Sequence, residues 1–340
     1  MTRGARIALA VGILAGVGWI IMAWADVPVM PSYLAAWLFW MAVPLGALPL
    51  AMALEALDAP AVALLAMLRR TLLLLPVGAL LAIPVLLRTA PLYRRPDLPD
   101  ALPAAWMAPG FFIARAVVIL VVLGLFAVMF SRAPRRAPRR GLAVLGLVLH
   151  VSLVSVAAVD WVLSLQPGLG SSAIGLLLIA SQVGVASCLA VFVLAVGTRD
   201  TEMPAGLGML LTVALAAWTF LHMIQYLVVW SANLPKEVTW YQARAPGLGG
   251  AMMWFAAAAI VVGLAVLPSG LARVPAVLAS VAAMLLAVHL VETLWLVTPA
   301  FRGAFTLNLA DILAMLGIGG LLVGLLLSRM PRAGRRHAAV

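Results

Sequence analysis

The sequence predicts an all-α protein that crosses a membrane about ten times. Of the 340 residues, 66% are hydrophobic and only 10% are charged, and the mean hydropathy is +1.17. A soluble domain of this length cannot bury so much apolar surface. Apolar runs of about 20 residues, the length that spans a bilayer as a helix, recur along the whole chain. Because lipid offers backbone groups no hydrogen-bond partner, these runs must be helices, and residues 1–340 are predicted to form one integral membrane domain.

Ten spans are expected in chain order. They cover residues 5–24, 33–54, 70–88, 105–130, 141–165, 171–196, 205–231, 249–267, 273–297 and 308–329. The first follows Arg3 and Arg6 as a secretion signal would, but its run of about 20 residues exceeds the apolar core of a signal, and no small-residue cleavage site stands out. It is therefore kept as a membrane span.

Polar residues mark where several spans end. Glu55 closes the second span, and the arginine- and proline-rich stretch 132–140 separates the fourth from the fifth. Asp160 and Trp161 close the fifth span, and a polar segment beginning at Trp230 follows the seventh. The loops are short, which leaves no room for an extramembrane cofactor domain.

The basic residues predict the orientation. Of the 22 lysines and arginines, 15 lie at the N-terminus, in the even-numbered loops or in the C-terminal tail, whereas six lie in the odd-numbered loops. Positive charge concentrates on the cytoplasmic side, so both termini are expected in the cytoplasm. The net charge of +11 therefore reflects topology and contact with lipid headgroups, not a nucleic-acid partner.

The single cysteine, Cys188, excludes several kinds of cofactor site. One thiol supports no disulfide framework, no C-x-x-C-H haem attachment and no iron–sulfur cluster, so Cys188 is expected to be a small packing residue. We expect the chain to bind no metal and no redox centre of its own. If electrons are involved, other subunits carry the centres.

Eight ionisable side chains in or beside the spans are candidates for a proton pathway, because a charge in hydrocarbon is costly unless it is paired or hydrated. They are Asp160, His289, Glu292, His150, His222, Arg115, Asp311 and Glu55. Four of them, on the fifth, seventh and ninth spans, fall at similar depth in the outer half. His289 and Glu292 are three residues apart and project from one helix face, which suits a hydrated cavity. About 15 Å of helix separates His150 from Asp160, so a complete relay would need waters or further polar groups.

Two structural alternatives stand beside this hypothesis. Arg115 is placed to be the counter-ion of Asp160, and a buried ion pair is weighed equally with a role in proton movement. His222 and His289 could hold a b-type haem between facing helices. Since they are the only plausible pair, the haem is less favoured than a polar cavity.

The segment between the seventh and eighth spans is the candidate surface for docking a periplasmic partner. The residues that motivate this are Trp230, Asn233, Pro235, Glu237, Trp240, Tyr241 and Arg244. Anchoring by an interfacial aromatic belt is the alternative.

At these residues the chain resembles a known family, the F subunit of alternative complex III, which is a bacterial quinol:cytochrome c oxidoreductase. That subunit is a relative of the NrfD and polysulfide-reductase membrane subunits. Residues 160–167 (DWVLSLQP), with Ser171, Ser172 and Gly175, are similar to the family's D-W-x-x-S-L-x-P…S-x-x-G stretch. Residues 225–244 are similar to its Q-Y-L-x-x-W-x-x-N-L-P-x-E-x-x-W-Y-x-x-R loop, and residues 292–299 (ETLWLVTP) are a weaker match.

The resemblance implies two four-helix bundles, over residues 33–165 and 171–297, with peripheral helices at 5–24 and 308–329. It implies a complex in the bacterial inner membrane whose partners are an NrfD-like C subunit, an iron–sulfur subunit and haem c cytochromes. Within it the F subunit is a cofactor-free scaffold proposed to conduct protons, although such subunits are also called quinone-binding. The chain departs from the family at Leu57–Pro60, where Gly-Gly-Trp is usual, and at Glu292, where Asp is usual.

Three functions therefore remain open from the sequence. The first is a non-redox subunit with a proton half-channel around Asp160, His289 and Glu292. The second is a subunit with its own quinol site, in which His150 or His222 accepts the proton. The third is a secondary transporter with two repeated bundles, which would need broken helices at matching positions of the halves.

Overall fold

The computed structural model describes residues 2–25, 28–93, 103–132, 140–165, 168–198 and 201–330. The helices in these ranges are α1 (Arg3–Trp24), α2 (Met30–Ala56), α3 (Val62–Leu72), α4 (Leu75–Leu80), α5 (Ile83–Leu87), α6 (Thr89–Tyr93), α7 (Pro109–Ser131), α8 (Arg140–Trp161), α9 (Ile174–Gly197), α10 (Ala205–Ala232), α11 (Pro235–Gln242), α12 (Leu248–Val266), α13 (Pro275–Val297), α14 (Pro299–Arg302) and α15 (Leu309–Ser328). Two short 3₁₀ helices, η1 (Leu163–Leu165) and η2 (Gly270–Arg273), complete the described elements.

Ten of the described helical segments are long and apolar enough to cross a membrane. This confirms the prediction of an all-α polytopic membrane protein. Nine of the ten agree with the predicted spans to within a few residues. The orientation in the membrane stays a prediction.

The predicted third span, 70–88, is wrong at its start and in its continuity. The helix begins at Val62, eight residues earlier, and includes Arg69. That arginine is tolerated because its guanidinium lies 2.8 Å from the carboxylate of Glu55. The segment then breaks into α3, α4 and α5, and Pro76 and Pro84 stand at the first turns of the two restarts. Proline lacks the N–H that continues a helix and is favoured where one begins, which accounts for both breaks.

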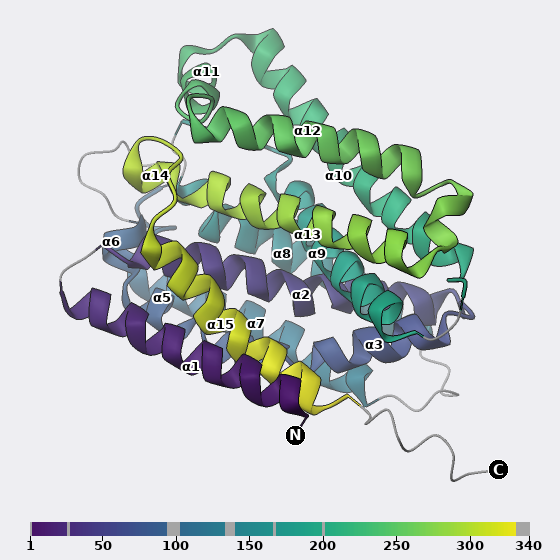
Figure 1. Ribbon diagram of the computed structural model, residues 1–340. Coiled ribbons are helices and arrows are strands. Elements are labelled where there is room, and N and C mark those ends of the chain that lie inside the picture. Colours follow the sequence, from purple (N-terminus) through teal and green to yellow (C-terminus); the bar gives the residue numbers. More distant parts are fainter. Residues whose placement is uncertain are drawn as a thin grey trace.

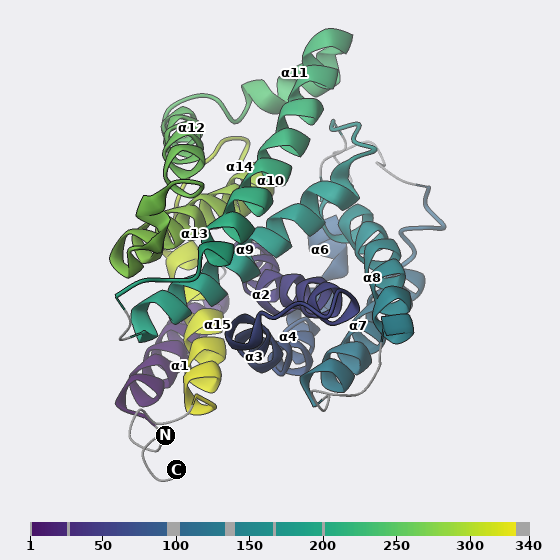
Figure 2. The ribbon, with the colours of Figure 1, turned by 90° about the vertical axis from the view of Figure 1, so that its right-hand side faces the viewer.

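Helix α2 is the centre of the molecule (Figure 2). It contacts α3, α7 and α8 on one side and α9, α13 and α15 on the other. Its closest neighbour is α9, since Gly46 faces the backbone of Gln182 so closely that a Cβ atom there would collide with the Gln182 carbonyl. Close approach of small residues is what holds helices together in lipid, where no hydrophobic effect operates between them.

The grouping of spans two to five and six to nine into two bundles stays a prediction. Helices α3, α7 and α8 pack on α2, α10 and α13 pack on α9, and α12 packs on α10 and α13. The two groups share the broad α2–α9 interface, so they are not separate bodies. Helices α1 and α15 form an antiparallel pair against α2, and α1 begins where α15 ends (Figure 1).

Candidate functional site

The Glu292 carboxylate on α13 is the centre of a buried polar cluster. Its Oε1 accepts hydrogen bonds from Trp218 Nε1 at 2.9 Å and lies 2.8 Å from His222 Nε2. Its Oε2 accepts from Ser181 Oγ at 2.8 Å and lies 3.0 Å from His289 Nδ1. We call these five residues the Glu292 cluster. Both carboxylate oxygens are therefore held by two partners each, which compensates for their removal from water.

Helix periodicity brings these residues together. His289 precedes Glu292 by three positions on α13, and Trp218 precedes His222 by four on α10, so each pair shares a helix face. The Trp218 ring packs 4.6 Å from the His222 ring and 5.2 Å from the His289 ring, centroid to centroid. On α9, Gly184 leaves the space that the His289 imidazole occupies, because a Cβ atom there would collide with the ring.

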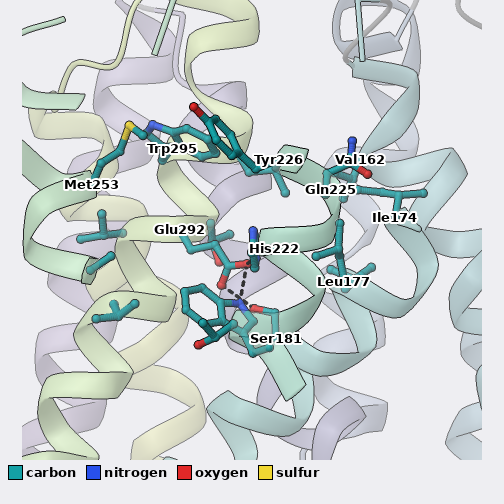
Figure 3. Close-up of a pocket in the computed structure, with 18 of the residues that line it drawn as sticks. Val162, Ile174, Leu177, Ser181, His222, Gln225, Tyr226, Met253, Glu292 and Trp295 are labelled. Carbon is teal, nitrogen blue, oxygen red and sulfur yellow. Dashed lines mark hydrogen bonds and ion pairs between the residues drawn. The ribbon is translucent and has the colours of Figure 1, made fainter. Parts of the chain in front are cut away.

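The Glu292 cluster lies at a cavity of about 350 Å³ (Figure 3). Its walls are mostly apolar and come from α2, α9, α10, α11, α12 and α13. His222 and Glu292 both line it, and the His222 side chain is 35% exposed. Met223 and Tyr226 of α10 and Met253 of α12 also line the cavity and are exposed on the membrane-facing surface. The cavity therefore reaches the lipid between α10 and α12.

Four further polar atoms on the cavity wall have no hydrogen-bond partner among the described residues. They are Gln182 Oε1, Thr219 Oγ1, Gln225 Nε2 and Trp295 Nε1. Gln225 is held in place because its Oε1 accepts a hydrogen bond of 2.7 Å from Ser171. Buried polar groups nearly always have a partner. The wall thus offers donors and acceptors to a guest molecule or to water.

Asp160 belongs to a second, separate cluster. Its carboxylate is fully buried and accepts two hydrogen bonds from the Arg115 guanidinium, from Nε to Oδ2 at 2.8 Å and from Nη2 to Oδ1 at 2.9 Å. Trp106 Nε1 donates to Oδ1 at 2.8 Å, and the guanidinium lies 4.1 Å from the centre of the Trp106 ring. The predicted Arg115–Asp160 ion pair is therefore confirmed, and no described hydrogen bond links it to Glu292.

The other candidates do not join either cluster. Glu55 pairs with Arg69, and Asp311 pairs with Arg302 through two contacts of 2.8 Å while capping the start of α15. His150 is fully buried, and neither of its ring nitrogens has a partner among the described residues. Described hydrogen bonds therefore do not connect the proton-pathway candidates Glu55, His150 and Glu292 to one another.

A bis-histidine haem does not fit this geometry. His222 and His289 both turn toward the one carboxylate of Glu292 instead of facing each other across an open gap. Within the described ranges, no group of three or more His, Cys, Asp or Glu residues could hold a metal ion.

One part of the candidate docking segment is buried beside the cavity, and the other part is exposed. Trp240 and Tyr241 line the cavity. Trp240 packs edge-on to Trp295 at 5.2 Å, and the Arg244 guanidinium lies 3.8 Å from the centre of the Trp240 ring. Trp240 and Arg244 are buried, so neither belongs to a docking surface. Burial, and secondarily the neighbouring Tyr226, raises the pKa of Tyr241 to about 12.

Trp230, Asn233 and Pro235 remain exposed, and Glu237 is half-buried. They surround the turn between α10 and α11. Asn233 adopts the left-handed conformation there (φ 47°), which asparagine tolerates better than most residues, and so ends α10.

Sequence reasoning missed Trp218 and Thr219. Trp218 stands four residues and Thr219 three residues before His222 on α10, so the i, i+3 and i, i+4 spacing was the available signal. No family model matches the chain, and no curated protein matches it.

Proposed function

We propose that this chain is an integral membrane subunit of a quinol-oxidising electron-transfer complex. The complex as a whole delivers electrons to a cytochrome c or a terminal oxidase. We place it in the inner membrane of a bacterium with both termini in the cytoplasm. Its partners are an NrfD-like C subunit, an iron–sulfur subunit and c-type cytochromes, which hold the redox centres. The support is the motif resemblance of residues 160–175 and 225–244, together with ten spans whose loops are too short for a cofactor domain.

Within that complex, the Glu292 cluster transfers protons. The observation that carries this role is a continuous chain of hydrogen-bonding groups in which His222, open to the cavity, contacts Glu292, and Glu292 contacts His289 and Ser181. Imidazole changes charge near neutral pH, so it can pass a proton to or from a carboxylate within hydrogen-bond reach. A low-dielectric wall confines the proton to this chain of groups.

The variant Glu292→Gln tests the proton role in the purified complex. It keeps the shape of the side chain but removes the proton-carrying group, so proton release per quinol oxidised is expected to fall at least several-fold. Glu202→Gln, in the exposed turn before α10, is the matched control and should behave as the unmodified complex. Unchanged release in Glu292→Gln would contradict the proton role.

A second candidate function is quinol binding in the same cavity. The specific observation is that an apolar space open to lipid leads to His222, with the unpaired Thr219 hydroxyl and Gln225 amide on the same helix. A quinol needs an apolar channel for its tail and a proton acceptor within reach of its hydroxyl.

A photoreactive quinone added to the purified complex tests this candidate. Labelling of α10 or α12 peptides that excess quinol suppresses would support it, and His222→Phe should abolish that labelling. Labelling confined to other subunits would contradict quinol binding in this cavity.

The transporter hypothesis receives less support. The third span is broken, but its counterpart in the second half, α10, is one continuous helix of 28 residues. Matching breaks in the two halves are the expected mark of such a transporter.

A further inference from the structure

Asp160 and Glu292 occupy matching positions in the two halves of the chain. Each lies near the end of the last long helix of its group, α8 or α13, and each precedes a proline by seven residues in the sequence. Each carboxylate also accepts a hydrogen bond from a tryptophan indole, Trp106 at 2.8 Å or Trp218 at 2.9 Å. The helix position of the acid and its spacing to a proline therefore agree between the halves, whereas the indole donors come from different elements, the turn before α7 and helix α10.

The two sites differ in the group that neutralises the carboxylate. Asp160 receives a bidentate arginine, whereas Glu292 contacts two imidazoles. Guanidinium stays charged at every physiological pH because its ordinary pKa is above about 12, while that of imidazole is about 6.5. The ion pair in the first half is also shielded from solvent, since Asp160 is fully buried and the Arg115 side chain is only 11% exposed.

Arg115 additionally fastens a loop to the helices. Its Nη2 donates to the backbone carbonyl of Trp106 at 3.0 Å, and its guanidinium lies over the Trp106 ring. Trp106 belongs to the turn that precedes α7, so the ion pair ties this turn to α8.

We propose that the two carboxylates are matching acid sites of the two halves, in which Arg115 holds the Asp160 site as a permanent structural ion pair and only the Glu292 site, through His222 and His289, changes charge. This inference rests on the proposed proton role of Glu292. It removes Asp160 and Arg115 from the proton pathway and makes them positioning residues for the loop.

Other titratable groups face the two sites and must be separated in a test. Tyr93 of α6 faces Asp160, and Tyr226 and Tyr241 line the cavity beside the Glu292 cluster. Burial, with the Asp160 charge adding to it, raises the pKa of Tyr93, so Tyr93 stays neutral at physiological pH. Burial also raises the pKa of Tyr241, so neither Tyr93 nor Tyr241 contributes between about pH 5 and 8.

Infrared difference spectra of the purified full chain between pH 5 and pH 8 test the inference. A pH-dependent carboxyl signal, a shift of the carboxylate bands as the contacting imidazoles gain a proton, is expected in the unmodified chain, absent in Glu292→Gln and retained in Asp160→Asn. Asp160→Asn should instead lower the unfolding temperature. If it does not fold, Arg115→Lys, which keeps the charge, should fold and show the unmodified signal.

Loss of the carboxyl signal in Asp160→Asn, or its persistence in Glu292→Gln, would overturn the division between the halves. A failure of the proposed proton role would give a different result. Glu292→Gln would then abolish the infrared signal while proton release by the complex stayed unchanged.

Discussion

At the scale of single residues, the identity of the cation decides what each buried carboxylate does. Arg115 provides two parallel hydrogen bonds to Asp160, and His222 and His289 provide one contact each to Glu292. The first arrangement is geometrically rigid and permanently charged. Under the proposed function, the second arrangement is the one that exchanges protons.

Substitution of Arg115 measures the structural value of the locked pair. Removing one partner of a buried ion pair leaves an uncompensated charge and costs about 3–5 kcal/mol, so Arg115→Gln should strongly destabilise the chain. Arg115→Lys keeps the charge but loses the planar fork and should cost less. Unfolding followed in detergent checks the order. Equal stability of all three proteins would contradict a structural role for the pair.

The residue types of the Glu292 cluster were predictable, but its assembly was only partly so. Hydropathy and depth placed His222, His289 and Glu292 at one level, because ionisable residues stand out in apolar spans. The sequence does not reveal how each helix is rotated about its axis. For that reason Trp218 was missed and Asp160 was grouped with Glu292, although its side chain pairs with α7.

At the scale of helices, small residues set how closely the peripheral pair packs. A Cβ atom on Gly12 of α1 would lie 2.7 Å from the backbone nitrogen of Leu321 on α15, whereas one on Gly16 would meet no atom within 4 Å. Two glycines one turn apart therefore differ sharply in how much space surrounds them.

Gly12→Ala should push α1 away from α15, while Gly16→Ala should be tolerated. Overpacking of this kind typically costs about 1–3 kcal/mol, and alanine is otherwise the better helix former. The thermal unfolding midpoint checks the pair of variants, with Gly16→Ala as the control. A lower midpoint for Gly16→Ala than for Gly12→Ala would show that the α1–α15 contact is packed differently.

Helix boundaries were predicted well because a bilayer leaves few alternatives to an apolar helix. The exception is the third span, whose start was misplaced because Arg69 and Arg70 look like the end of a loop. The partner that makes Arg69 acceptable, Glu55, lies 14 residues earlier on a different helix. Hydropathy along one segment does not detect such a pairing.

At the scale of the whole molecule, the architecture separates a scaffold from a site. Helix α2 and its neighbours form a buried centre, while the cavity lies beside the more exposed α10 and α12. The exposed turn around Asn233 leads into α11, whose Trp240 lines the cavity.

The most direct test of the central claim is purification of the tagged full-length chain in a mild detergent, with visible spectra and mass spectrometry of what accompanies it. Membership of a quinol-oxidising complex predicts haem c absorption that co-elutes with the chain, together with an iron–sulfur subunit and an NrfD-like subunit. A colourless chain that elutes alone under conditions preserving other respiratory complexes would contradict the proposal.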